Sequence, residues 1–153
     1  MSEPKRPSLA SGVYYRDPRA ALKWLEEAFG FEPTMVVINE DGTLGHSEMR
    51  FGDGMIMVGR EWDERHQSPA SIGGVNTQAV HIQVEAGIEA HFERAKKAGS
   101  VVLRELADQF YGDRNFMVAD PEGHVWSFGQ TIAVMSNAEM EKAKPGVIIR
   151  ERL

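Results

Sequence analysis

The sequence predicts an α+β fold made of two copies of one βαβββ unit. Two pairs of glycines share one spacing: Gly54 and Gly123 lie 69 residues apart, and so do Gly30 and Gly99. The first pair stands in turns before apolar strands, and the second pair closes helix-like stretches. Two unrelated landmarks with one offset indicate an internal duplication. The 153 residues can form one good core, or two small units that share a core.

The first predicted unit spans residues 9–60 and follows a flexible, polar N-terminal arm at residues 1–8. Asp17 and Pro18 are typical of a helix start, and Gly30 of its end. Between them, apolar residues recur at helical spacing. Strands are expected at residues 9–16, 31–39, 46–51 and 55–59.

The second predicted unit spans residues 77–130, after a polar, glycine-rich connector at residues 61–76. A second apolar stripe at helical spacing ends at Gly99. Strands are expected at residues 79–85, 101–106, 115–119 and 125–128. A C-terminal extension at residues 131–153 carries a short capped helix, residues 136–144, which Pro145 and Gly146 stop. We expect this extension to cover a sheet edge or to reach a partner subunit.

Composition excludes several classes of protein. The net charge is −6 and there is no cluster of five basic residues, which argues against nucleic acid and anionic membranes as partners. No apolar run is long enough to span a membrane, and the N-terminus does not resemble a signal peptide. The chain has no cysteine, so it has no disulfides and no thiolate chemistry. We therefore expect a cytoplasmic protein.

Three stretches together resemble a known family: Tyr15 through Phe31, Val80 through Val84, and Asp120 through Gly123. From Leu9 to Phe128 the chain resembles the vicinal oxygen chelate superfamily, which includes glyoxalase I, bleomycin-resistance proteins and extradiol dioxygenases. The Tyr111–Arg114 stretch resembles its uncharacterised phosphonate-operon-type branch. The resemblance implies curved sheets that face each other around a shared cavity, often across a homodimer. It does not specify a function, because the superfamily hosts many chemistries and simple binders.

The resemblance also bears on metal binding. Metal-binding members place one ligand on the first and last strand of each unit. His81 matches such a position, but Ser127 stands where a carboxylate is expected, and the 69-residue offset gives Gly12 and Val58 for the other two. Because this set holds one strong ligand, we expect no metal cofactor. A divalent metal stays open through a displaced set, His81 with His46 and Glu48.

Strand alternation predicts which residues line a ligand pocket. Apolar residues of each strand should pack on the helices, and the alternate residues should face the cavity. The candidate ligand-binding residues are Tyr14, His46, Glu48, Arg50, Val58, His81, Gln83, Tyr111, Arg114, Met117 and Ser127. The candidate catalytic residues are Glu48 and His81.

Two of these candidates have plain structural alternatives. His81 could be a histidine that is simply hydrogen-bonded within a sheet. Arg114 could clamp an anionic ligand, or it could pair with Asp113 or Asp120.

Two functions follow from these observations. The first is a small-molecule binder without metal, like the antibiotic-sequestering members of the superfamily, that works as a homodimer. The second is a metal-dependent lyase, isomerase or dioxygenase that uses the displaced ligand set. We rank the binder first because three of the four expected ligand positions lack a strong donor.

Overall fold

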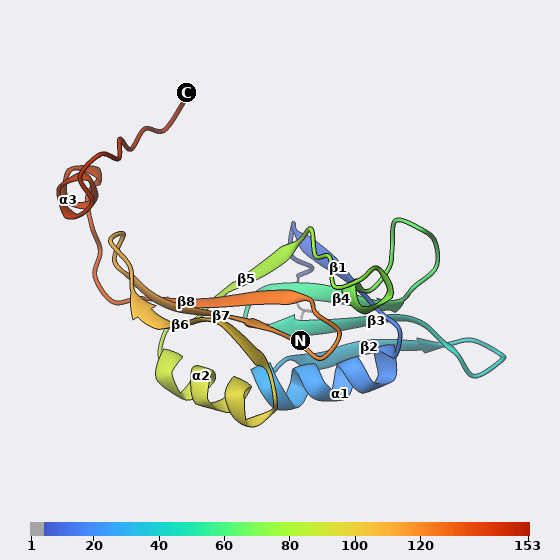
Figure 1. The fold of residues 1–153 in the computed structure, drawn as a ribbon. Coiled ribbons are helices and arrows are strands. Elements are labelled where there is room, and N and C mark those ends of the chain that lie inside the picture. Colours follow the sequence, from blue (N-terminus) through green and yellow to red (C-terminus); the bar gives the residue numbers. More distant parts are fainter. Residues whose placement is uncertain (1–4) are drawn as a thin grey trace.

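Two four-stranded sheets and two long helices form the body of the protein in the computed structural model, which describes residues 5–153 (Figure 1). Residues 1–4 of the predicted flexible arm lie outside the described residues. The first unit contains β1 (Ala10–Tyr15), α1 (Pro18–Phe29), β2 (Glu32–Ile38), β3 (Leu44–Phe51) and β4 (Gly54–Arg60). The second contains β5 (Ala79–Gln83), α2 (Ile88–Lys97), β6 (Val101–Asp108), β7 (Asp113–Ala119) and β8 (Val125–Thr131).

The two units share one topology, which confirms the predicted fold class. The sheets have the orders β1-β4-β3-β2 and β5-β8-β7-β6. In each sheet the first and last strands of the unit are parallel neighbours, and the remaining pairs are antiparallel. Both helices cover the same side of the molecule, so each sheet has a helix-facing side and an open side (Figure 1).

The predicted equivalence of Val58 and Ser127 is wrong by one residue. In register, Gly12 pairs with Met57, whereas His81 pairs with Ser127. The reason is a difference in the turns: Gly52 and Asp53 join β3 to β4, whereas residues 120–124 join β7 to β8. Because alternate residues of a strand face opposite sides, this shift moves Val58 from the open side into the core, where it is fully buried.

Helix α1 begins and ends where the sequence predicts. The Asp17 side chain accepts a hydrogen bond from Ala20 N at 3.0 Å, and Gly30 closes the helix with φ +81°. Arg94 of α2 then donates to the backbone oxygens of Glu26 and Glu27, at 2.9 and 2.7 Å. Glu26 O also accepts from the Gly30 backbone N–H at 3.0 Å, and the Arg94 side chain adds donors at this helix end, so the two helices are joined.

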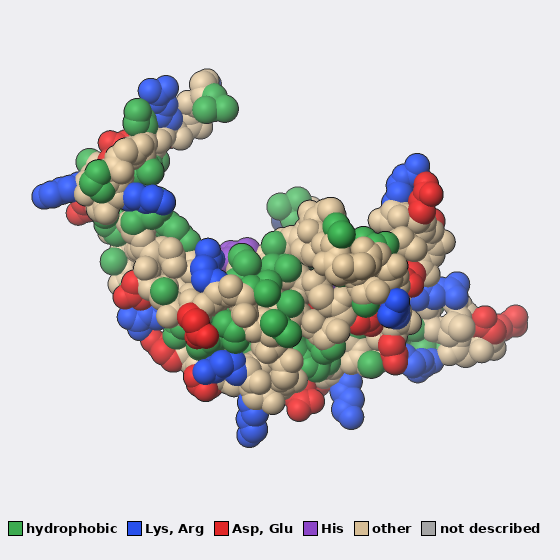
Figure 2. All heavy atoms as spheres, in the orientation of Figure 1, with side chains coloured by type: hydrophobic (Ala, Val, Ile, Leu, Met, Phe, Trp, Pro, Cys, Tyr) green, Lys and Arg blue, Asp and Glu red, His purple; other side chains and the backbone are tan. Residues whose placement is uncertain are grey.

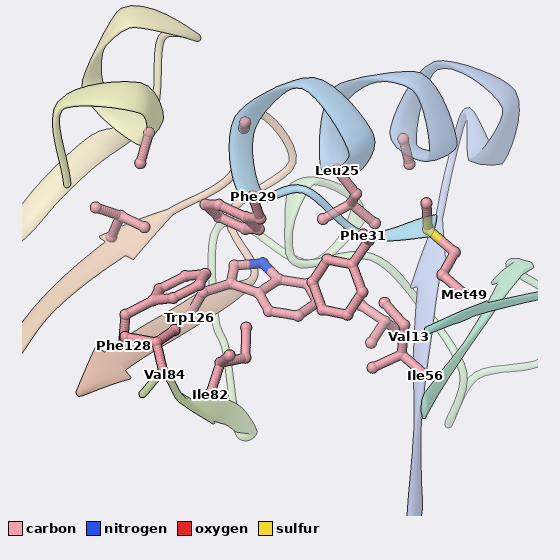
Figure 3. Packing of buried hydrophobic residues seen from close by; sticks show 14 of the residues in the cluster. Val13, Leu25, Phe29, Phe31, Met49, Ile56, Ile82, Val84, Trp126 and Phe128 are labelled. Atoms are coloured by element: carbon pink, nitrogen blue, oxygen red, sulfur yellow. The ribbon is translucent and has the colours of Figure 1, made fainter. Parts of the chain in front are cut away.

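The core is a single cluster that spans both units (Figure 3). Phe29 of α1 contacts Trp126 and Phe128 of β8, with ring centroids 5.4 and 4.9 Å apart. Phe31, just before β2, also packs on Trp126 at 5.7 Å. All four rings are at most 2% exposed, so neither unit completes its own core without the other.

A second link between the units is centred on Asp120, in the turn before β8. This carboxylate is 3% exposed and accepts hydrogen bonds from the Tyr15 hydroxyl at 2.6 Å and from Trp126 Nε1 at 3.1 Å. It also accepts from the backbone N–H groups of Glu122 and His124, both at 3.0 Å. Burial and the neighbouring Asp120 raise the pKa of Tyr15 well above its usual value, which keeps the phenol protonated as a donor.

The C-terminal extension leaves the body and projects away from it (Figure 1). Its helix α3 (Asn137–Ala143) is the predicted short capped helix, its cap is a capping box between Ser136 and Glu139, and it buries no residue. At its base, the backbone N–H groups of Ile132 and Ala133 both donate to Gly112 O. Within residues 5–153, no helix is long and apolar enough to cross a membrane.

Candidate functional site

The open side of the first sheet carries a row of side chains that contains one carboxylate. Gly12, Met57, Glu48 and Met35 lie in register across the four strands. Tyr14 lies beside this row, and its ring packs over Gly12 and Gly59. A Cβ atom at Gly12 would lie 2.8 Å from the Tyr14 hydroxyl oxygen, so glycine makes room for the ring.

Glu48 is the charged centre of this face, and a guanidinium covers it. The residue is 6% exposed. Arg6 donates from Nη1 to Oε2 at 3.0 Å and from Nη2 to Oε1 at 2.8 Å. His46 Nε2 lies 3.2 Å from Oε1 and completes the contacts. The hydrogen bonds from Arg6 and then His46 lower the pKa of Glu48 against the opposing effect of burial, so it is ionised at neutral pH.

The connector adds aromatic rings beside Glu48. Trp62 and His66 stack with centroids 4.1 Å apart, and His66 meets the edge of Tyr14 at 4.9 Å. Asp63 lies 2.6 Å from His66 Nδ1 and orients the imidazole. A cavity of about 260 Å³ lies here, lined by Tyr14, Gly45, His46, Met57, Gly59, Arg60 and Trp62. This cavity combines the aromatic rings of Tyr14 and Trp62, the thioether of Met57 and the guanidinium of Arg60.

The open side of the second sheet carries a chain of polar groups. Asp113 Oδ2 accepts from Gln83 Nε2 at 3.2 Å, and Gln83 Oε1 lies 2.8 Å from His81 Nε2. Since an amide oxygen can only accept, His81 Nε2 carries a proton and donates to Gln83. The other ring nitrogen, Nδ1, lies 2.6 Å from the Ser127 hydroxyl oxygen, so His81 is held between Gln83 and Ser127.

Tyr111 and Met117 also belong to this second face. Met117 pairs with Ser127 in register. The Tyr111 hydroxyl accepts a hydrogen bond from Asn115 Nδ2 at 2.7 Å. Asn115 is 3% exposed, and among the described residues its Oδ1 has no hydrogen-bond partner.

Three predicted pocket residues lie elsewhere. Val58 is in the core, as described above. Arg50 borders a separate hollow of about 380 Å³ with Glu32, His91 and Arg94. Arg114 forms ion pairs with Asp108, at 2.6 Å, and with Glu89 at the start of α2. These contacts place its side chain toward helix α2. Its partners are not the predicted Asp113 and Asp120.

The structure adds residues that the sequence analysis did not place in the pocket. Met57 takes the position predicted for Val58, and Asp113 ends the polar chain. Arg6, predicted to be part of a loose arm, is the partner of Glu48. Nothing in the local sequence around Arg6 indicates this contact, because its partner is 42 residues away.

The residues present do not fit a divalent metal centre. The positions on the first and last strands are Gly12, Met57, His81 and Ser127, which together offer one strong ligand. Both ring nitrogens of His81 are engaged. In residues 5–153 no group of three His, Asp or Glu side chains converges to hold a metal, so His81 is not gathered with His46 and Glu48.

A larger cavity, of about 540 Å³, lies between the two units. Its walls come from β1 and β4 of one unit and from β5 of the other. Polar groups of Gln78, His81 and Gln83 meet the apolar side chains of Ile56 and Ile82 there. Figure 2 shows that the surface above the sheets is a wide hollow, with the C-terminal extension rising on one side.

Comparison with known proteins gives relatives across most of the chain. An uncharacterised Mycobacterium bovis protein, Mb0911c, is 31% identical over 141 residues, covering 90% of this chain and 91% of the relative. The crystal structure of TioX from Micromonospora sp. ML1 is 32% identical, with a TM-score of 0.66, and the match covers 80% of this chain and 97% of TioX.

A third match is TnmS3, described as an antibiotic binding protein from Streptomyces sp. CB03234. It is 18% identical with a TM-score of 0.60, covers 80% of this chain and 93% of TnmS3, and so shares the fold. The family model for the Glyoxalase/Bleomycin resistance protein/Dioxygenase superfamily matches residues 9–128. That span begins before β1 and ends within β8, so it covers nearly all of both βαβββ units, and the chain therefore belongs to this superfamily.

Proposed function

We propose that this protein binds a small, planar organic molecule on the open faces of its sheets without a metal centre. The observation that carries the proposal is the cavity beside Glu48, where Tyr14, Trp62 and Met57 surround a space of about 260 Å³. Flat rings and a thioether suit aromatic ligands, because stacking needs no fixed hydrogen-bond pattern. The antibiotic binding described for TnmS3, which shares the fold, supports this class of ligand.

A second copy of the chain is proposed to close the open faces. Met35, Val36, Val37 and Ile38 of β2 are each 43–48% exposed, and Val134 of the extension is 94% exposed. Exposed apolar residues along an edge strand and on a projecting segment are typical of protein–protein contacts. Light scattering on the purified protein is expected to give the mass of a dimer, and a monomer mass at micromolar concentration would contradict this part of the proposal.

The binding proposal is tested with a panel of planar aromatic antibiotics of positive, neutral and negative charge. We expect at least one compound to raise Tm with saturation and to be recovered chemically unchanged by mass spectrometry. Trp62→Ala should weaken that binding about 2- to 10-fold, because one stacked ring contributes about 0.5–1.5 kcal/mol. Trp62→Phe keeps a ring and is the matched control, with most of the affinity retained.

Two outcomes would contradict the binding proposal. Chemical conversion of a bound compound would favour the enzyme alternative, a lyase, isomerase or dioxygenase of the same superfamily. Elemental analysis that found stoichiometric metal after chelator treatment would do the same. The phosphonate-operon-type resemblance of residues 111–114 and the cytoplasmic location stay predictions.

A further inference from the structure

The carboxylate of Glu48 has an unusual environment for a strand residue. Its neighbours in register are Met35 and Met57, so no cation of the sheet itself is paired with it across the strands. At 6% exposure a carboxylate needs a cation or several donors, since burial without them costs free energy. The pair of donors comes from Arg6, which reaches both oxygens at once.

Arg6 does not belong to the sheet that it covers. It lies before β1 in a stretch without regular secondary structure, and its side chain is 63% exposed. Among the described residues, the hydrogen bonds of its guanidinium all go to Glu48. An ion pair with one exposed partner is weak, because water and salt compete for the exposed group. The guanidinium can therefore leave at low cost, provided that another cation takes its place.

The space next to Glu48 suits such a cation when it is attached to a ring. His46 contacts Glu48 at 3.2 Å and also lines the cavity of about 260 Å³, as does Met57, the register partner of Glu48. Tyr14 and Trp62 line the same cavity, and Trp62 is 63% exposed. Aromatic faces attract cations as well as rings. His46 and Met57 thus connect the carboxylate to the cavity that the rings line, and Arg60 is the cation on the wall of that cavity.

We propose that this site takes an aromatic ligand with an amine, amidine or guanidine group, and that Arg6 is an internal competitor for it. The ligand cation replaces the Arg6 guanidinium on Glu48, and its ring packs against Trp62 and Tyr14. This inference rests on the proposed binding function and adds the charge class of the ligand. Because Arg6 is tethered, its effective concentration at Glu48 is high, and it screens out weakly binding cations.

Benzamidine is the probe that tests the inference, with benzamide as its neutral analogue. Titrations use the full chain and follow tryptophan fluorescence and heat. If the guanidinium occupies Glu48 about 90% of the time, Arg6→Ala should bind benzamidine about tenfold more tightly than the unmodified chain. Lys5→Ala, which removes the neighbouring charge of the same arm, is the matched control and should leave the affinity unchanged.

The variants of Glu48 and the neutral probe decide the remaining outcomes. Glu48→Gln should lose the preference for benzamidine over benzamide, with the fold verified by circular dichroism. Equal binding of both probes by Arg6→Ala would overturn the inference and leave the binding function intact. Unchanged benzamidine affinity in Arg6→Ala would also overturn it. Failure of the binding function itself has a different signature, namely that no compound of the antibiotic panel binds to the unmodified chain.

Discussion

Replacing Asp120 by alanine is expected to lower the free energy of unfolding by about 3–5 kcal/mol. The substitution removes the common acceptor of the Tyr15 hydroxyl, Trp126 Nε1 and two backbone N–H groups. Tyr15 and Trp126 are at most 2% exposed, so water does not reach the two side-chain donors that lose their partner. Urea unfolding followed by circular dichroism measures the loss.

Asp53, which lies in the corresponding turn of the first unit, provides the matched control for Asp120. It is exposed, and Asp53→Ala is expected to change stability by less than about 0.5 kcal/mol. A double-mutant cycle with Tyr15→Phe separates the phenol contact from the turn contacts, because coupled residues give non-additive losses. If Asp120→Ala lowered the free energy of unfolding by less than about 1 kcal/mol, the hydrogen bonds to this buried carboxylate would contribute little to stability.

Phe29→Ala is expected to cost a similar amount, about 3–5 kcal/mol, through the shared core. The ring is 1% exposed and contacts Trp126 and Phe128 of the other unit. Its removal leaves a cavity at the point where the two units meet. Thermal unfolding should show a lower Tm and still a single transition, because neither unit has a complete core of its own. Leu9→Ala, at a residue that is 86% exposed, is the control for a loss of apolar volume.

Two separate transitions in the Phe29→Ala variant would contradict the shared core. The result would mean that each unit is stable alone and that the contacts across Phe29 join two finished domains. Comparison of the calorimetric and van't Hoff enthalpies distinguishes the two cases.

Local signals in the sequence predicted most of the fold. Asp17 and Pro18 start α1 and Gly30 ends it because capping and positive φ depend on a few adjacent residues. The alternation of Val80, Ile82 and Val84 with His81 and Gln83 likewise gave the correct sides of β5. These features depend on the spacing of residues within one element, which a single sequence contains.

The pocket was harder to predict because its residues come from separate elements. Val58 was misplaced because the two copies differ in the turn before the last strand, and a one-residue shift reverses the sides of a strand. The contact of Arg6 with Glu48 depends on how a segment without regular structure returns across a sheet. For Arg114 the sequence leaves open an anionic ligand or a pair with Asp113 or Asp120, whereas its partners Asp108 and Glu89 approach through strand pairing and helix packing.

The hydrogen bonds that converge on Asp120 have a consequence for the lifetime of the folded chain. Its bond to Tyr15 joins residues that are 105 positions apart. We expect a contact across so long a loop to form late in folding, because the entropy cost of closing the loop precedes the contacts that reward it. Interactions absent from the folding transition state act mainly on the rate of unfolding. We therefore expect Asp120→Ala to raise the rate of unfolding and to leave the rate of folding almost unchanged, which folding and unfolding kinetics in urea would show.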